Sequence, residues 1–328
     1  METPQTFRAV PPLPLLVLLL TGLHTDGYKP VIIVHGLFDG PKQFVVLSQY
    51  IKKVHPGTEV KTISLYNNLA SLKPMWRQVE GFRMHVQSIM KESPDGVHLL
   101  CFSQGGLICR ALLSTTPDHN VHTFISLSSP QAGQYGDTDY LKWIWPDHMK
   151  KTVFHVCYNT FGQKVSVCDY WNVTAGIGST PTATPNGISC IENAWMDGFP
   201  DFQKTVDPHH RPSYLRYNIF LAVINGERPN KHMKEWRENF LRIKKLVLIG
   251  GPDDGVITPW QSSHFGFYDS NENIVEMRNQ EIYKNDTFGL KTLDARGDVS
   301  TCVHSGVKHT LWHSNFTVFQ SCIEKWLT

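Results

Sequence analysis

Leu99-Leu-Cys-Phe-Ser-Gln-Gly-Gly-Leu107 is the stretch of sequence that decides the fold. An apolar run that predicts a buried strand leads into Ser103, and small residues that let a helix start close to that strand follow it. A serine at such a sharp turn projects its hydroxyl at the carboxyl edge of a sheet, as a nucleophile requires. The N–H of Gln104 at the helix N-terminus can stabilise an oxyanion there. Cys101 replaces the first glycine of the usual Gly-x-Ser-x-Gly motif, and the alternative is an ordinary βα turn.

Strands and helices are predicted to alternate on both sides of this turn. We expect strands at 30–35, 59–65, 97–102, 121–128 and 245–249, and helices at 41–54, 72–90, 105–114 and 315–327. This alternation predicts an α/β fold with a mostly parallel, doubly wound sheet. It fails between about 131 and 240, where we expect an inserted cap region.

The composition excludes several classes of protein. The chain has 328 residues, a formal net charge of +2 and 18% charged residues, against roughly 25% in a typical globular domain. With 41% hydrophobic residues it is not a disordered chain, and its balanced charge gives no basic face for nucleic acid. The length suits one large α/β domain or two average ones.

Residues 1–27 are predicted to be a cleaved secretory signal peptide, which leaves 28–328 as the mature chain. Arg8 precedes an apolar run at 15–20, and polar residues follow that run. Even counted from Val10, the run is shorter than the roughly 20 residues of a membrane-spanning helix, so we expect no transmembrane segment. The alternative is a buried helix or a signal anchor.

The chain has seven cysteines. If the protein is exported, these cysteines are candidates for disulfides, because disulfides form in oxidising compartments. Six of them lie in sequence-near pairs: Cys101/Cys109, Cys157/Cys168 and Cys302/Cys322. Proximity alone does not establish pairing, and Cys190 is left over. No CxxC spacing occurs and His209-His210 lack partners at ligand spacing, so we expect no metal site. The sequence also holds three candidate N-glycan acceptors: Asn172, Asn285 and Asn315.

Two loops that follow predicted strands supply further parts of a serine-hydrolase site. His-Gly-Leu at 35–37 follows the first strand, where the backbone N–H of Leu37 can be the second oxyanion donor. The alternative there is a turn glycine beside a buried histidine. Pro-Asp-Asp-Gly at 252–255 follows a later strand, and either Asp253 or Asp254 can orient a histidine.

The loop before the C-terminal helix contains His304, His309 and His313. Of these, His309 lies clearest of Cys302 and of the helix, so its ring is the freest to reach Ser103. The resulting order of serine, aspartate and histidine is that of α/β-hydrolases. Because the general base must be neutral, we expect activity to fall as the pH drops through the titration of His309.

Longer blocks of the sequence resemble the palmitoyl-protein thioesterase family over nearly all of the mature chain. These blocks lie at 28–39, 97–107, 126–131, 133–142, 248–263 and 309–315. The resemblance implies an α/β-hydrolase fold in which Ser103 is the nucleophile, His309 the base and Asp254 the acid. It also implies three disulfides: Cys101–Cys109, Cys157–Cys168 and Cys302–Cys322.

The resemblance further implies a lysosomal glycoprotein that hydrolyses long-chain fatty acyl thioesters, such as palmitoyl-CoA, without a metal or cofactor. Residues at about 172–206 depart from the family pattern and are expected to be an atypical insertion. Two other functions remain open. A secreted lipase or carboxylesterase acting on oxyesters would use the same triad, and a catalytically silent lipid-binding homologue would not use it at all.

A fatty acyl chain requires an apolar groove, which we expect within 131–240. The apolar and aromatic candidates for its lining are Trp143, Ile144, Trp145, Phe154 and Trp195. The alternative is that these side chains only pack the cap region.

Overall fold

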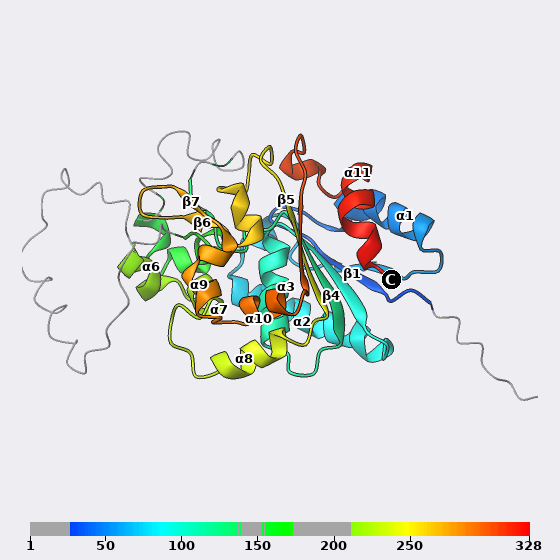
Figure 1. Ribbon diagram of the computed structural model, residues 1–328, viewed down its shortest axis with the longest axis horizontal. Coiled ribbons are helices and arrows are strands. Elements are labelled where there is room, and N and C mark those ends of the chain that lie inside the picture. The colour runs from blue at the N-terminus through cyan, green and yellow to red at the C-terminus, as the bar shows by residue number, and fades with distance from the viewer. Residues whose placement is uncertain (1–26, 137, 139–152, 154, 173–210) are drawn as a thin grey trace, which may run out of the picture.

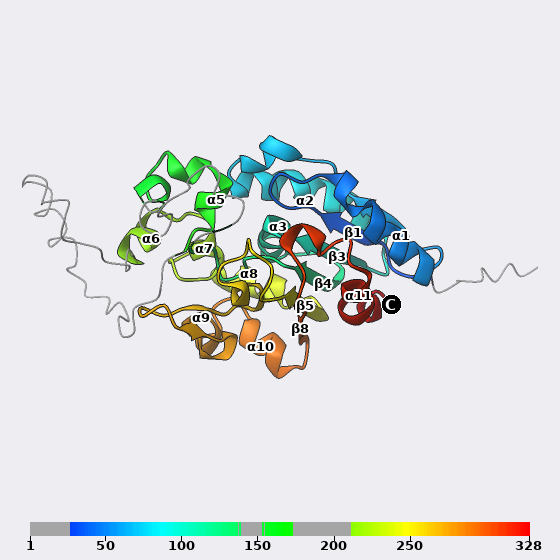
Figure 2. The same ribbon diagram turned by 90° about the horizontal axis from the view of Figure 1, so that it is seen from above.

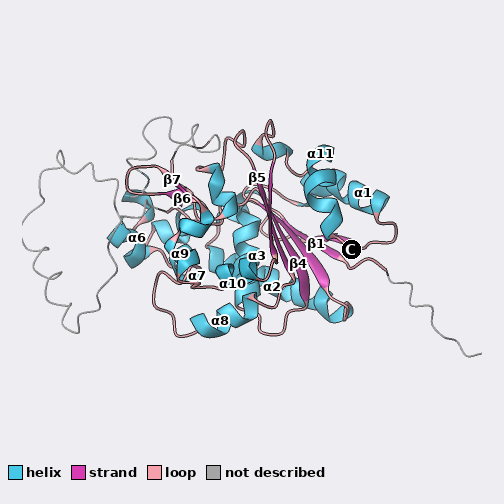
Figure 3. Ribbon diagram, viewed as in Figure 1, coloured by secondary structure: helices cyan, strands magenta, loops and turns pink. Residues whose placement is uncertain are grey.

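A parallel sheet of six strands forms the centre of the molecule (Figures 1 and 3). The computed structural model describes residues 27–136, 138, 153, 155–172 and 211–328. In spatial order the strands are β2 (Val60–Thr62), β1 (Val31–Val34), β3 (Val97–Phe102), β4 (Val121–Leu127), β5 (Lys245–Gly250) and β8 (Val299–Val303). All neighbouring strands pair in parallel, which confirms the predicted α/β class.

Helices cover both faces of this sheet (Figures 1 and 2). On one face lie α1 (Val45–Val54) and α11 (Phe316–Val318), and on the other lie α2 (Met75–Glu92), α3 (Gln104–Ser114) and α8 (Met233–Phe240). Among the described residues, the other α-helices are α5 (Ser166–Asp169), α6 (Arg211–Tyr217), α7 (Leu221–Ile224), α9 (Glu281–Lys284) and α10 (Leu290–Ala295). A small hairpin is formed by β6 (Phe267–Tyr268) and β7 (Ile274–Val275). No helix in the described part of the chain has the length and apolar character to cross a membrane.

The side chains of the central strands alternate between two hydrophobic clusters. In β1, Ile32 and Val34 pack in the cluster that includes α2 and α3, whereas Val31 and Ile33 pack in the cluster that includes α1 and the C-terminal helices. All four are fully buried, as continuous β-branched runs in parallel sheets are. The helices on both faces therefore follow directly from the apolar character of both sides of each strand.

Most predicted elements occur close to their expected bounds, and the exceptions are the two edge strands and the C-terminal helix. β2 is shorter than the strand predicted at 59–65. β8 was not predicted, because this edge strand is only partly buried and lacks a continuous apolar run. The predicted helix at 315–327 is a succession of short α, π and 3₁₀ turns.

The irregular stretch at 131–240 contains α5, α6, α7 and α8 among its described residues. Several sequence predictions concern residues outside the described ones: the signal peptide, most of the expected insertion, Cys190, the pair His209-His210, and the groove candidates Trp143, Ile144, Trp145, Phe154 and Trp195.

Three disulfides join the pairs that the family resemblance implies. Cys101–Cys109 links β3 to α3 on either side of Ser103, and Cys302–Cys322 ties β8 to the C-terminal helical turns. Cys157–Cys168 closes a short loop that ends in α5.

The glycosylation prediction at Asn172 conflicts with the structure. Asn172 is 5% exposed, and the amide nitrogen that would carry a glycan donates a 2.7 Å hydrogen bond to the carbonyl oxygen of Ala132. Asn285 is exposed, and Asn315 is partly exposed and caps α11 through its side-chain oxygen. These two remain predicted glycan acceptors.

A buried carboxyl joins the cap region to the main fold. Asp169, at the end of α5, is 0% exposed, and its Oδ2 accepts a 2.7 Å hydrogen bond from the N–H of Met75 at the start of α2. Burial raises the pKa of Asp169 to about 7, although the Met75 N–H opposes this. The protonated form is therefore favoured in the folded protein.

We predict that Asp169 makes the protein more stable in acid than at neutral pH. Its stabilising contribution is complete below pH 3.8 and is lost as the pH rises through about 7, because the folded-state pKa lies above the unfolded value. Asp169→Asn keeps an oxygen for the Met75 N–H but cannot ionise. Its thermal unfolding midpoint should exceed that of the wild type by about 5 °C or more near pH 8, with a much smaller difference near pH 4. A pH dependence of unfolding that is the same in both proteins would contradict this assignment.

Candidate active site

Ser103 occupies the sharp turn between β3 and α3. Its φ of 53° is in the left-handed region, which only a strongly constrained non-glycine residue adopts. Two glycines allow this packing. A Cβ on Gly36 would lie 2.6 Å from the Cβ of Ser103, and one on Gly105 would lie 2.5 Å from the carbonyl oxygen of Val34. The strand-turn-helix geometry predicted around Ser103 is therefore present.

A chain of hydrogen bonds connects Ser103 to two residues from distant loops. Nε2 of His309 lies 2.9 Å from Oγ of Ser103, and Nδ1 lies 2.9 Å from Oδ2 of Asp254. His309 is 1% exposed, Asp254 2% and Ser103 6%, so the chain is nearly closed to solvent. In this arrangement the imidazole donates through Nδ1 to the carboxylate and can accept the hydroxyl proton at Nε2.

Asp254 is held by donors from several parts of the chain. Oδ1 accepts from the backbone N–H groups of Val256 (3.0 Å) and Ile257 (2.7 Å). Oδ2 accepts from Oγ of Ser128 (2.5 Å) and Nε1 of Trp312 (2.6 Å), in addition to His309. Burial alone would raise the pKa of this carboxyl, but the nearby His309 and the hydrogen bonds from Ser128 and Ile257 outweigh burial and lower the pKa from its ordinary value.

The other histidines and the other aspartate considered for the catalytic roles have different partners. His304 is partly exposed, and its Nδ1 lies 3.0 Å from the carbonyl oxygen of Ser305. His313 is buried against Phe102, and burial together with the nearby His309 lowers its pKa to about 4. Oδ2 of Asp253 accepts from the backbone N–H of Gly306. The structure thus brings His309 and Asp254 to Ser103.

The two proposed oxyanion donors flank Ser103. Gln104 is the first residue of α3, where the backbone N–H has no partner within the helix. Leu37 lines the same pocket as Ser103. The loop that carries Leu37 is fixed through Ser71, whose Oγ accepts from the N–H of Phe38 (2.8 Å) and whose carbonyl oxygen accepts from the side chain of Gln104 (2.9 Å).

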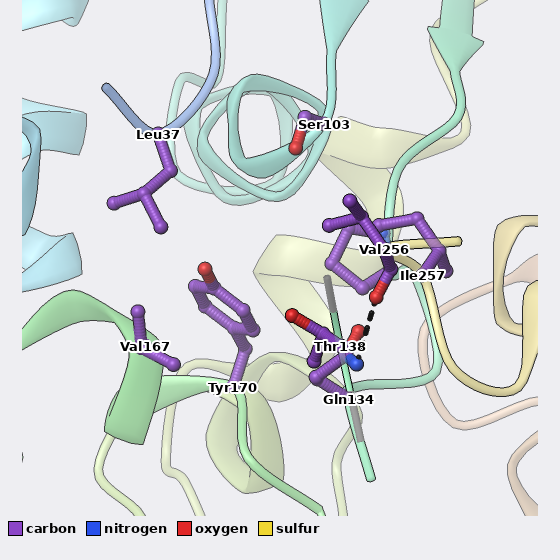
Figure 4. Close-up of a pocket in the computed structure, with 9 residues that line it drawn as sticks. Leu37, Ser103, Gln134, Thr138, Val167, Tyr170, Val256 and Ile257 are labelled. Carbon is purple, nitrogen blue, oxygen red and sulfur yellow. Dashed lines mark hydrogen bonds between the residues drawn. The ribbon is translucent and has the colours of Figure 1, made fainter. Parts of the chain in front are cut away.

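A predominantly apolar pocket opens beside Ser103 (Figure 4). Figure 4 shows Leu37 and Val167 on one side, Val256 and Ile257 on the other, and Tyr170 facing Ser103 across the space. The pocket is completed by Pro130, Gln134 and Thr138. The pocket is narrow, because the space in it that a water-sized sphere can occupy is only about 30 Å³.

Several residues of this site were missed by sequence reasoning. Ser128 lies in the block 126–131 that resembles the family, and Trp312 lies in the block 309–315, but neither had been given a role. Val167 and Tyr170 lie inside the expected cap but carry no motif. The cysteine pair that ends at Cys168 is the one local signal that this segment is held in place.

Comparison with known proteins places this geometry in a family. The sequence model of the family described as palmitoyl protein thioesterase matches residues 30–179 and 202–309. The gap in this match, 180–201, falls inside the predicted insertion.

Three curated relatives align over nearly their whole length. Human lysosomal thioesterase PPT2 is 51% identical over 97% of this chain and 94% of its own. Lysosomal thioesterase PPT2-B of Xenopus laevis is 45% identical over 96% and 98%, and the Drosophila melanogaster homolog of PPT2 is 38% identical over 92% and 92%.

Among solved structures, the mature lipase BlEst2 of Bacillus licheniformis covers 90% of this chain and 91% of its own at 15% identity. Its TM-score of 0.46 is a likeness too distant to bear on activity. The family assignment rests on the sequence matches together with the parallel sheet and the turn at Ser103. The chain belongs to the palmitoyl protein thioesterase family, a family of thioester hydrolases with the α/β-hydrolase fold.

Proposed function

We propose that this chain hydrolyses long-chain fatty acyl thioesters, palmitoyl-CoA and related S-acyl compounds among them, through an acyl-enzyme on Ser103. The observation that carries this proposal is the hydrogen-bond chain from Ser103 through His309 to Asp254, at the mouth of an apolar pocket. Membership of a thioesterase family supports the substrate class.

Acylation begins at Oγ of Ser103. Nε2 of His309 takes the hydroxyl proton while Oγ attacks the thioester carbonyl carbon, and Asp254 stabilises the imidazolium that forms. The negative charge passes to the carbonyl oxygen, which the N–H groups of Leu37 and Gln104 bind. Each such donor contributes roughly 3–4 kcal/mol to the transition state. Collapse of the tetrahedral intermediate breaks the C–S bond, and the thiol leaves with the proton from His309.

Deacylation repeats the same chemistry with water. His309 removes a proton from a water molecule as its oxygen attacks the acyl carbonyl carbon, and then returns that proton to Oγ of Ser103 as the acid is released. The reaction is a hydrolysis in which every proton moves through His309. Nothing in these steps calls for a cofactor.

The apolar pocket is the proposed site of the acyl chain next to the carbonyl. Val167, Val256 and Ile257 present apolar surface beside Oγ of Ser103. Burying methylene groups against such side chains is favourable by about 0.8 kcal/mol each, which would favour long chains over short ones.

We also propose where and in what form the protein acts. Several relatives bear the name lysosomal thioesterase, and export through a signal peptide at 1–27 agrees with the three disulfides and two candidate glycan acceptors. The mature chain, 28–328, would then be one hydrolase domain whose cap spans about 131–240. The irregular stretch at 172–206 would be an insertion within that cap.

The first prediction from this mechanism concerns the nucleophile. Ser103→Ala should lower kcat for palmitoyl-CoA hydrolysis by at least about 10⁴-fold, because no acyl-enzyme can form. A fluorophosphonate probe should label the wild type at Ser103 and leave the variant unlabelled. Hydrolysis that survives in a folded Ser103→Ala protein would rule out this mechanism. Absence of labelling in the folded wild type would favour a silent lipid-binding protein.

The second prediction separates thioesters from oxyesters. A thiolate leaves more readily than an alkoxide, so kcat/KM for a palmitoyl thioester should exceed that for the palmitoyl oxyester by at least about tenfold, or about 1.4 kcal/mol in the barrier. Both substrates should carry leaving groups of similar size. Equal or faster turnover of the oxyester would instead identify a lipase or carboxylesterase.

The third prediction tests the acyl pocket. Val167→Trp places a large side chain in the pocket and should reduce kcat/KM for palmitoyl-CoA about tenfold or more, while hydrolysis of an acetyl thioester changes little. Val165→Trp is the matched control, because Val165 is exposed and does not line the pocket. Equal losses on long and short chains would place the acyl chain elsewhere.

A further inference from the structure

Ser128 sits at the centre of the catalytic edge of the sheet. It directly follows β4, and β4 lies between β3, which leads to Ser103, and β5, which leads to Asp254. The parallel register therefore places Ser128 between the nucleophile and the acid. Its backbone N–H donates a 2.7 Å hydrogen bond to the carbonyl oxygen of Ile249 at the end of β5.

The backbone of Ser128 adopts a conformation that favours glycine. Its φ is 44°, in the left-handed region, which is unfavourable for a residue that carries a side chain. A glycine would adopt this conformation without that cost. The presence of a serine at such a position points to a use for its hydroxyl.

The hydroxyl of Ser128 contacts both of the groups that prepare Ser103. Oγ donates a 2.5 Å hydrogen bond to Oδ2 of Asp254 and lies 3.3 Å from Nδ1 of His309. Ser128 is 0% exposed, so its hydroxyl is shielded from bulk solvent and this hydrogen bond does not compete with water. Trp312 donates to the same carboxylate oxygen from the opposite end of the chain.

We propose that Ser128 is a positioning residue, a fourth member of the catalytic hydrogen-bond chain, which keeps Asp254 ionised and aligned with His309 under acidic conditions. This inference rests on the proposed catalytic roles of Ser103, His309 and Asp254. Ser128 neither attacks the substrate nor transfers a proton, since its hydroxyl only donates to the carboxylate.

The sign of the effect follows from the charge on the carboxylate. A hydrogen bond from Ser128 stabilises the ionised form of Asp254 and makes it a weaker base. Loss of that bond would favour protonation of Asp254 and strengthen its hold on a protonated His309. The stronger hold on the imidazolium removes the neutral base at a higher pH than in the wild type, and a protonated Asp254 no longer orients His309 as a carboxylate does, so activity in acid falls in either case.

Other titratable groups near His309 remain unchanged in this comparison. Burial raises the pKa of Asp39, while His309 and His35 oppose the rise. Burial and the nearby His309 lower the pKa of His313 to about 4. Since these groups contribute equally to wild type and variant, a difference between the two profiles reports the hydroxyl of Ser128.

The test is the pH profile of kcat and kcat/KM for palmitoyl-CoA, from about pH 4 to about pH 8, in Ser128→Gly and Ser128→Ala. Both variants should lose about tenfold in kcat with little change in KM, and their acid limbs should move up by about half to one pH unit. Ser128→Gly should unfold at a higher temperature than Ser128→Ala, because both lose the same hydrogen bond but only glycine adopts the left-handed conformation without strain. Activity would then follow the hydroxyl and not the stability.

Ser129→Ala is the matched control. Ser129 is the adjacent buried serine, and its Oγ accepts a hydrogen bond from the side chain of Gln131 and not from Asp254 or His309. Its acid limb should coincide with that of the wild type. An unshifted acid limb in Ser128→Gly, with or without a loss of kcat, would overturn the proposal.

The Ser103→Ala variant distinguishes a failure of the Ser128 proposal from a failure of the proposed function. If Ser103→Ala abolishes hydrolysis while Ser128→Gly leaves the profile unmoved, only the role of Ser128 is wrong. If Ser103→Ala retains hydrolysis, the catalytic chain itself is wrong.

Discussion

The close approach of α3 to the sheet at Ser103 is the constraint on which the rest of the site depends. Ser103 is held at a φ of 53° between a fully buried strand and a helix whose every residue is buried. Gly36 and Gly105 leave the space, and the Cys101–Cys109 disulfide spans the turn. This packing offsets the strain, which is roughly 1–2 kcal/mol for a left-handed residue, and it leaves the hydroxyl of Ser103 within hydrogen-bond distance of His309.

Asp254 is the second constraint on the site, because it holds His309 in place beside Ser103. An isolated buried carboxylate costs several kcal/mol, so it persists only where hydrogen bonds replace water. Its donors come from the loop after β5, from Ser128 after β4, and from His309 and Trp312 after β8. The ionised carboxylate thus joins the ends of three strands, and the geometry of the base depends on the register of the sheet.

Much of the fold was predictable because buried parallel strands have a plain signature. A largely apolar run such as 97–102 indicates a strand that is covered by other elements on both faces. The turn at Ser103 that follows this strand indicated the fold class. β8 escaped prediction because an edge strand needs no such run. Asn172 was misjudged because a sequon contains no information about burial, and its amide nitrogen is engaged in the interior by Ala132.

The amino-acid sequence by itself determined the strand-turn-helix around Ser103 and the order of serine, aspartate and histidine. It also limited the general base to a few histidines in one loop. Only the tertiary structure decided that Asp254 rather than Asp253 faces His309, and that Ser128, Trp312 and Ser71 hold the site together. The physical reason is distance along the chain. Local patterns report which residues prefer a strand or a turn, whereas hydrogen bonds between residues 126 or 206 positions apart exist only once the strands have paired.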